Sequence, residues 1–133
     1  MSHAILNPYG LHNPVPFGYS HTASVPAGTD LVFVSGQYGS GTEGTVVSAD
    51  FAAQVQQAFS NVDIALAAHD LDLMNVVQLR TYVVDLDFEK LATIGQAVAA
   101  RCGDLPPTQT VIGVASLAAP DILFEVEAVA AGA

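Results

Sequence analysis

Two glutamates on the last predicted strand are the residues best suited to acid–base chemistry. Glu125 and Glu127 alternate with apolar residues, so their side chains share one face of the strand predicted over 122–130. A carboxyl group in a partly buried cleft has its pKa raised towards neutrality and can then exchange protons with a substrate. Glu125 is therefore a candidate general acid/base, and Glu127 is a weaker candidate. Alternatively, Glu125 is a solvated strand residue or pairs with Arg80.

The strand predicted over 75–85 has two unlike faces. The face suited to packing under a helix holds Val77, Leu79, Thr81 and Val83. The opposite face holds Gln78, Arg80 and Tyr82. Because this second face is too polar for a dry core, we expect it to line a cleft or to meet another subunit. Arg80 is also one of only three cationic residues in the chain.

The histidines, the cysteine and the serines do not predict a site by their spacing. The histidines, His3, His12, His21 and His69, lack the short separations typical of zinc ligands, so no metal is expected. His21 either titrates near neutral pH in a cleft or is an exposed strand residue. Cys102, the single cysteine, excludes an intramolecular disulfide and fits a small core residue on a helical stripe. No serine lies in a nucleophile elbow.

Turn residues and apolar periodicity predict the elements that position these side chains. Residues 1–18 are rich in proline and glycine and predict an extended segment with one short strand over 4–6. Strands over 19–25 and 31–37, separated by turn residues, predict a hairpin. The remaining predicted elements are a helix over 48–69, the strand over 75–85, a helix over 87–102 whose buried stripe includes Phe88, and strands over 108–115 and 122–130.

The order β-β-α-β-α-β-β in 133 residues predicts a single α+β domain. Two helices cannot cover both faces of so wide a sheet, so we expect them on one face, with the other face left to self-association. Composition favours the same conclusion, because 51% of residues are hydrophobic and only 12% are charged, against about 25% in typical domains. The alternative is an unusually alanine-rich and valine-rich solvated surface.

Charge and hydropathy exclude several classes of partner. Three Lys and Arg residues face 13 Asp and Glu residues, for a net charge of −10. A nucleic-acid-binding protein needs a basic surface, so a nucleic-acid partner is not expected. No apolar run approaches the roughly 20 residues that cross a bilayer, and the first residues do not resemble a signal peptide. With a single cysteine, we expect a cytoplasmic location and no membrane partner.

Several segments, in order and in register, resemble the RidA (YjgF) family of reactive intermediate deaminases, also called the endoribonuclease L-PSP family. The segments are Gly18-Tyr19-Ser20-His21, Val32-Phe33-Val34-Ser35-Gly36-Gln37, 54–61, 81–86, Pro106-Pro107 and 124–130. The resemblance extends from about Pro14 onward. It implies a chorismate-mutase-like α+β fold with two helices on one face, assembled as a homotrimer around a central barrel, with a ligand cleft between each pair of subunits.

The resemblance also implies a cofactor-free reaction, the hydrolysis of small enamines and imines such as 2-aminoacrylate to a keto acid and ammonia. It assigns the water-orienting glutamate to Glu125 and the cleft tyrosine to Tyr19. Ser35 matches a serine that contacts the ligand, and the backbone at Val111 matches the segment that helps to hold the water. His21 stands where the family often has glutamine or a small residue. Alternatively, Tyr19 is an aromatic residue of the subunit interface, and Ser35 makes a hydrogen bond to a nearby backbone group.

Two departures from the family pattern bear on the substrate. Gln109 replaces the arginine that holds the substrate carboxylate, and Ala92 replaces an asparagine. Glutamine carries no charge, so a carboxylate ligand loses on the order of 2–4 kcal/mol of binding unless Arg80 supplies the missing cation. Otherwise the substrate is neutral or cationic. A trimer that binds metabolites or acts like a chaperone without deaminase activity is the alternative. An endoribonuclease is a third interpretation, and it is disfavoured because an acidic surface repels phosphate.

Overall fold

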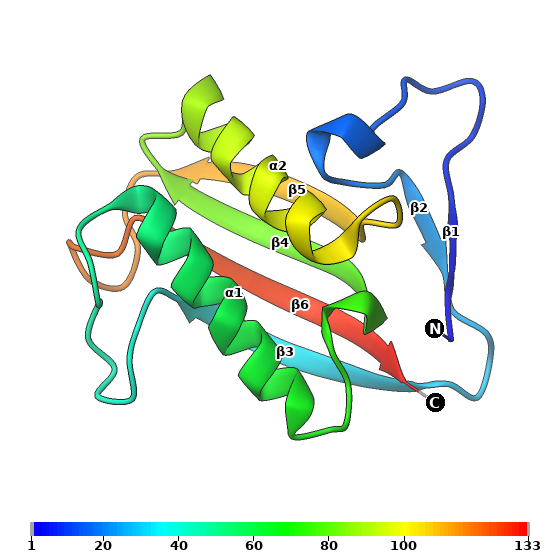
Figure 1. Cartoon of the computed structure of the whole chain (residues 1–133), viewed down its shortest axis with the longest axis horizontal. Helices are drawn as coiled ribbons and strands as arrows, with labels where there is room; N and C mark the ends of the chain where they lie inside the picture. Colours follow the sequence, from blue (N-terminus) through cyan, green and yellow to red (C-terminus); the bar gives the residue numbers. More distant parts are fainter. Residues whose placement is uncertain (1, 133) are drawn as a thin grey trace.

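The computed structural model describes residues 2–132. Two helices, α1 (Phe51–Ala67) and α2 (Phe88–Cys102), lie on one face of a four-stranded sheet (Figure 1). The strand order is β3-β6-β4-β5, with antiparallel pairs β3·β6 and β6·β4 and a parallel pair β4·β5. The strand bounds are β3 (Asp30–Tyr38), β4 (Val76–Val84), β5 (Thr108–Val114) and β6 (Phe124–Gly132). This arrangement confirms the predicted α+β architecture.

Aspartate caps begin both helices, the first of them three residues after the predicted start at residue 48. The Asp50 carboxylate accepts a hydrogen bond from the Ala53 amide at 3.0 Å, and the Asp87 carboxylate accepts one from the Lys90 amide at 2.8 Å. Each bond satisfies one of the backbone donors that a helix leaves unpaired in its first turn. The second helix ends at Gly103, whose φ of +58° is accessible to glycine at little cost.

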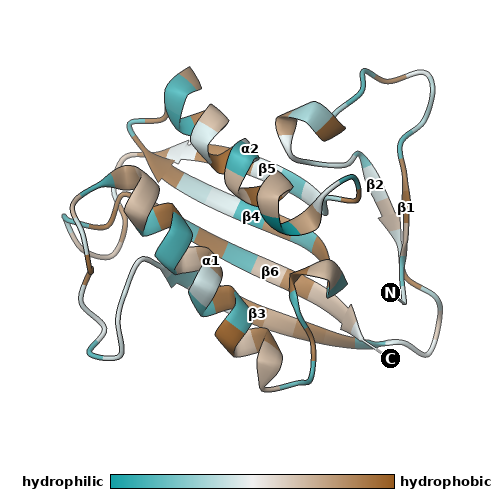
Figure 2. Cartoon of the chain, viewed as in Figure 1, coloured by the Kyte–Doolittle hydropathy of each residue, from teal (hydrophilic) through white to brown (hydrophobic). Residues whose placement is uncertain are grey.

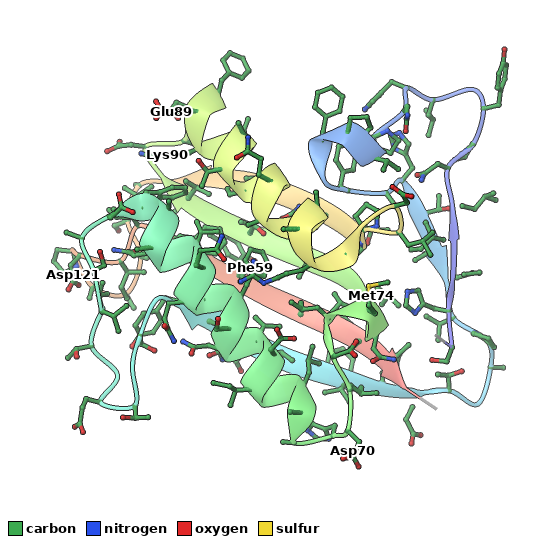
Figure 3. All side chains as sticks on the ribbon, viewed as in Figure 1. Phe59, Asp70, Met74, Glu89, Lys90 and Asp121 are labelled. Atoms are coloured by element: carbon green, nitrogen blue, oxygen red, sulfur yellow. The ribbon has the colours of Figure 1, made fainter. Side chains whose placement is uncertain are left out.

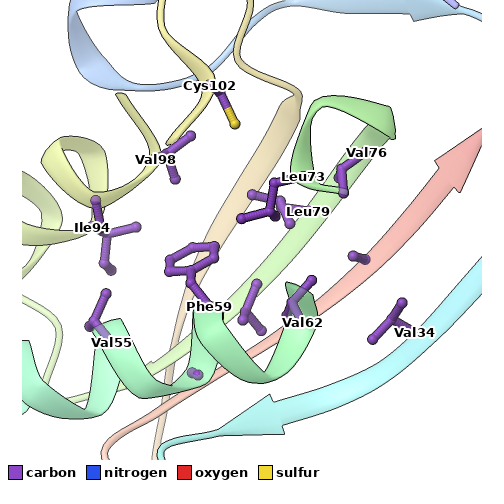
Figure 4. Close-up of a cluster of buried hydrophobic side chains, with 14 of the residues drawn as sticks. Val34, Val55, Phe59, Val62, Leu73, Val76, Leu79, Ile94, Val98 and Cys102 are labelled. Carbon is purple, nitrogen blue, oxygen red and sulfur yellow. The ribbon is translucent and has the colours of Figure 1, made fainter. Parts of the chain in front are cut away.

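The core lies between the two helices and the sheet (Figure 4). Its largest buried side chains are Phe59 of α1 and Phe124 of β6, which pack together at a ring-centroid distance of 5.9 Å. Cys102 is part of this cluster, and burial raises the pKa of its thiol to about 11. The thiol therefore stays protonated and serves as a small core side chain. The other buried members of the two helices are Val55, Ala58, Val62, Leu66, Ile94, Ala97 and Val98.

The predicted hairpin is wrong. The strand β2 (Thr22–Ser24) pairs with β1 (Ala4–Leu6) as a separate two-stranded ribbon, whereas β3 pairs with β6. Both β3 and β6 are nine residues long, so they can pair along most of their length. The three-residue β2 cannot offer β3 the same number of backbone hydrogen bonds. The short 3-10 helix η1 (Val15–Phe17) interrupts the segment before β2, and a second one, η2 (Leu73–Asn75), precedes β4.

Phe88 is not part of the buried stripe of α2. It is the first residue of the helix, and its side chain is 90% exposed. The periodicity is correct from the second turn onward, because Ile94, Val98 and Cys102 are all buried. The first turn of α2 lies beyond the edge of the core. Phe88 therefore has the spacing of the buried stripe but remains exposed.

The face of the sheet turned away from the helices, here called the open face, carries a mixed set of side chains. Alternation along β6 places Glu125 and Glu127 on this face and Phe124 and Val126 in the core. Figure 2 shows hydrophilic residues between hydrophobic ones along this strand. The open face is formed by Leu31, Phe33, Ser35, Gln78, Arg80, Tyr82, Thr110, Ile112, Glu125 and Glu127.

The N-terminal segment packs against α2 through two glycines. A Cβ atom on Gly18 would lie 2.6 Å from the Gly95 carbonyl oxygen, and one on Gly95 would lie 2.7 Å from the Phe17 carbonyl oxygen. Gly18 also has a φ of +83°, a conformation that side chains disfavour. The chain backbone at η1 can approach α2 this closely only because both positions are glycine. Figure 1 shows the segment beside α2, outside the main sheet.

Candidate functional site

Glu125 and Ser35 lie on adjacent strands of the open face. Glu125 pairs with Tyr38, and the β3·β6 register shifts just before this pair, between Val34 and Gln37, so that Ser35 and Gly36 form an irregularity. The Glu125 side chain lies over Gly36, where an added Cβ would be 2.8 Å from the carboxyl carbon. The missing side chain at residue 36 therefore makes the space that this carboxyl group occupies.

Glu127 is engaged by a neighbouring tyrosine. The Tyr82 hydroxyl donates a short hydrogen bond to Glu127 Oε1, and this bond, followed by burial, raises the pKa of Tyr82. Arg80 lies opposite Glu127 in the strand register and opposes that pKa shift. Since Glu127 already holds the tyrosine, Glu125 is the better candidate on this face for work on a ligand.

Tyr19, Gln109 and Val111 line a groove of about 1000 Å³ between η1, α2 and β5. Apolar side chains form most of its wall, and Phe88, which the sequence analysis placed in the core, is one of them. Ala92 also lines it, at the position where the family pattern has asparagine. We call this cavity the helix groove.

A smaller cavity of about 490 Å³ lies on the other side of Tyr19. It includes His21 and Gln78, and it shares Tyr19, Gln109 and Thr110 with the helix groove. Tyr19 therefore stands between two hollows, with His21 facing one of them.

Gln109 is oriented by a buried threonine. Its Oε1 accepts a hydrogen bond from Thr81 Oγ1 at 2.8 Å, and Thr81 is fully buried. With that oxygen held, Gln109 presents its amide nitrogen, a hydrogen-bond donor without charge, to a ligand. The family's arginine position is therefore occupied by an uncharged donor whose other end is tied to the core.

The cations of the chain lie elsewhere. Lys90 donates to the carbonyls of Val84 (3.1 Å) and Asp85 (2.8 Å) at the end of α2 farthest from the N-terminal segment (Figure 3). Arg101 donates to Gln56 and stacks over Phe59. Among residues 2–132, no Lys or Arg lines either cavity.

Arg80, expected as a candidate substitute for the missing arginine, is on the open face. Thr110 of β5 and Glu127 of β6 flank it in the strand register. It therefore shares a sheet face with Glu125 and Ser35 and not the helix groove with Gln109. In a single chain it cannot supply a charge beside Gln109.

The contact of Tyr19 with His12 was not predicted from the sequence. His12 Nε2 lies 2.5 Å from the Tyr19 hydroxyl oxygen, and His21 Nε2 donates to the His12 carbonyl at 2.8 Å. The two imidazole rings meet edge to face at 4.8 Å. We call His12, Phe17, Tyr19 and His21 the N-terminal cluster. No spacing rule marks His12, because the turn at η1 brings it back to Tyr19.

The predicted site residues thus fall into two sets that one chain keeps apart. Glu125 and Ser35 are on the open face, whereas Gln109 and Val111 point to the helix side of β5 and Tyr19 lies beside them. The strand β4 separates β6 from β5.

Within residues 2–132, no cluster of three or more His, Cys, Asp or Glu residues is placed to hold a metal. No helix of this part of the chain is long and apolar enough to span a bilayer.

Comparison with known proteins identifies the family. Residues 13–132 match the family model described as Endoribonuclease L-PSP. The RutC family protein YjgH of Escherichia coli is 32% identical over 114 residues, which cover 84% of this chain and 82% of that protein.

Solved structures agree with this match. The Rid family protein YyfB of Yersinia pestis, described as of unknown function, superposes with a TM-score of 0.92 at 35% identity, covering 98% of this chain and 99% of that one. The Escherichia coli YjgF product superposes with a TM-score of 0.67 at 30% identity, covering 80% and 84% of the two chains. The chain therefore belongs to the endoribonuclease L-PSP family, that of the RidA and YjgF proteins.

Proposed function

We propose that this chain is a hydrolytic deaminase of small reactive enamines or imines, acting in clefts between copies of itself. The observation that carries the proposal is the separation of the site residues. Glu125 lies over Gly36 on the open face, while Tyr19 and Gln109 line the helix groove. Packing the open face of one copy against the groove of the next would join the two sets into one enclosed site.

The open face has the character of a surface that another copy covers. Phe33 is 74% exposed, and Leu31 and Ile112 are exposed on the same face. Monomeric proteins rarely leave large apolar patches in water. A homotrimer with three clefts would cover this apolar patch and would agree with the family pattern.

In such a cleft the reaction needs a positioned water and a way to move protons. Glu125 would take a proton as water attacks the C=N carbon, forming a carbinolamine. Protonation of the nitrogen and loss of the hydroxyl proton then release ammonia and leave a carbonyl group. Tyr19, Ser35 and the Val111 carbonyl would orient the ligand and the water, and no cofactor is required.

The helix groove favours a substrate without a carboxylate. An anion bound there would meet the uncharged donor Gln109 and apolar walls that include Ala92 and Phe88. Charge-assisted hydrogen bonds are roughly twice as strong as neutral ones, so the loss of the arginine penalises anions selectively. We therefore expect neutral imines to be preferred over 2-aminoacrylate.

Ammonia release from freshly generated 2-aminoacrylate and from neutral imines tests the proposal. We expect turnover of at least one neutral imine, and we expect Glu125→Gln to lower kcat/KM by about 10²-fold or more, the usual worth of a general acid or base. Glu43→Gln, in an exposed loop, is the matched control and should keep wild-type activity. Equal turnover by wild type and Glu125→Gln would contradict the assignment.

A second candidate, a metabolite-binding trimer without deaminase activity, is favoured by the apolar groove and by Ala92. A structural neighbour, Escherichia coli TdcF, is described with bound serine; it has a TM-score of 0.68 at 25% identity and covers 82% of this chain and 85% of its own. Thermal-shift measurements against neutral and charged metabolites distinguish the candidates, because a ligand that binds only the folded state raises Tm. Binding without any turnover would favour the second candidate, and cleavage of RNA that survives Glu125→Gln would favour an endoribonuclease.

A further inference from the structure

We propose that His12 sets the direction of the hydrogen bond made by Tyr19, so that Tyr19 becomes a donor towards the ligand when His12 is protonated. The effect on a ligand rests on the proposed function, because it needs the cleft between copies, whereas the His12–Tyr19 hydrogen bond lies within one chain. His12 is in this sense a positioning residue that acts through Tyr19.

The geometry of the pair is set by the N-terminal cluster. His21 donates from Nε2 to the His12 carbonyl at 2.8 Å, which fixes the backbone of residue 12 and requires a proton on that nitrogen of His21. The His21 amide in turn donates to Asn7 Oδ1 at 2.7 Å. His12 Nε2 then meets the Tyr19 hydroxyl at 2.5 Å, with the rings 6.0 Å apart and nearly perpendicular.

The protonation state of His12 decides which partner donates. In the imidazolium ion both ring nitrogens carry protons, so Nε2 must donate to the Tyr19 oxygen. The hydroxyl proton then points away from His12 and is available to an acceptor such as an imine nitrogen. When Nε2 carries no proton, the hydroxyl donates to His12 and offers a ligand only its oxygen lone pair.

This arrangement also provides a balanced proton path. A proton passing from the Tyr19 hydroxyl to the imine nitrogen is replaced on the tyrosine oxygen by the Nε2 proton of His12. The imidazolium becomes a neutral imidazole protonated on Nδ1, so no oxidant, reductant or cofactor is involved. In the single chain His12 is exposed to solvent, from which it can regain the proton.

Few other groups compete for this control. Of the described residues that line the helix groove, His12 and Tyr19 are the titratable ones. The α2 wall contributes Phe88, Leu91 and Gln96, and β5 contributes Gln109 and Thr110. His21 lines the smaller cavity, but its ring also meets that of His12 at 4.8 Å, so it is the titratable group nearest to His12 besides Tyr19; Glu125 of a second copy would be a further one in the proposed cleft. Histidine is the side chain that ordinarily changes charge between pH 5 and 8, the range in which this switch would operate.

Ring-nitrogen NMR of the wild-type protein tests the pair without any substrate. We expect Tyr19→Phe to shift the His12 Nε2 resonance and its titration midpoint, while the signals of His69, in the exposed turn after α1, stay unchanged. Identical His12 titrations in wild type and Tyr19→Phe would overturn the proposal, whether or not the protein is a deaminase.

The pH profile of kcat/KM on a turned-over neutral imine tests the consequence. Between pH 6 and 8 we expect the wild-type rate to rise as pH falls, because protonated His12 frees the Tyr19 proton. His12→Gln should remove this slope and lower the rate at pH 6 about tenfold, the worth of one hydrogen bond; His69→Gln should change neither. If the enzyme is active and the pH dependence of kcat/KM survives His12→Gln, this inference is overturned and the proposed function is not. If the protein is inactive but Tyr19→Phe still shifts the His12 signals, only the proposed function is overturned.

Discussion

The two halves of the candidate site are built in different ways. Glu125 and Ser35 sit on neighbouring strands of a continuous hydrogen-bonded sheet above a buried core. Tyr19, by contrast, belongs to an irregular segment held by a few side-chain hydrogen bonds and by the contact between Gly18 and Gly95. The half that holds Glu125 is thus anchored by the whole fold, whereas the half that holds Tyr19 is anchored locally. The N-terminal segment can therefore change without moving Glu125.

The largest effect on stability should come from the core that both halves share. Phe59→Ala removes a fully buried ring between α1 and the sheet and should lower the free energy of unfolding by about 3–5 kcal/mol. Chemical denaturation measures the loss. Ile64→Ala, on the exposed side of the same helix, is the control and should change stability by no more than about 0.5 kcal/mol. Equal losses for the two variants would mean that the sheet half does not depend on this core.

A smaller effect should separate the N-terminal half from the sheet half. Gly95→Ala adds a Cβ 2.7 Å from the Phe17 carbonyl, which is backbone and cannot simply rotate away. We expect a loss of about 1–3 kcal/mol, typical of overpacking, because the clash outweighs the roughly 1 kcal/mol that alanine gains over glycine inside a helix.

Hydrogen exchange locates that effect. Exchange should accelerate in residues 7–21 and stay unchanged in β6. Gly10→Ala lies in the same segment with nothing within 4 Å of the added atom and should be neutral. Faster exchange spread evenly over β6 would show that the two halves are not independent.

The smallest effect on stability should come from the glycine beneath Glu125. Gly36→Ala places a Cβ 2.8 Å from the carboxyl carbon of a flexible side chain, so the carboxyl group moves while the fold remains. We expect a stability change below about 1 kcal/mol but a loss of deaminase activity of about tenfold or more. Gly41→Ala, whose added atom makes an ordinary 3.5 Å contact, should retain activity. Full activity of Gly36→Ala would show that the position of the Glu125 carboxyl group is not critical.

Local patterns predicted much of the sheet half. Alternation of apolar and polar residues placed Leu79 and Thr81 in the core and Arg80 on the opposite face, because a strand has only two faces. The second helix begins where it was predicted, at its aspartate cap Asp87, whereas the first begins at Phe51, three residues after the predicted start. Such features depend on near neighbours in the sequence and can be inferred without the fold.

Features that depend on distant partners could not be inferred in the same way. The hairpin prediction was wrong because β3 found a longer partner in β6, far along the chain. The contact of Glu125 with Gly36 depends on an irregular register between two strands, and that of His12 with Tyr19 on the path of η1. No local pattern encodes either contact. The resemblance to the family supplied Tyr19 and Glu125 as candidates, but it did not indicate His12.

The glycine pair that seats the N-terminal segment has one more consequence. Gly18 and Gly95 meet backbone to backbone, so the fit is determined by main-chain shape and not by any side chain on the rim. Residues such as Phe17 and Tyr19 can accordingly be exchanged during evolution while their mounting stays the same. The lining of the helix groove can therefore diverge without loss of the backbone contact that holds the segment against α2.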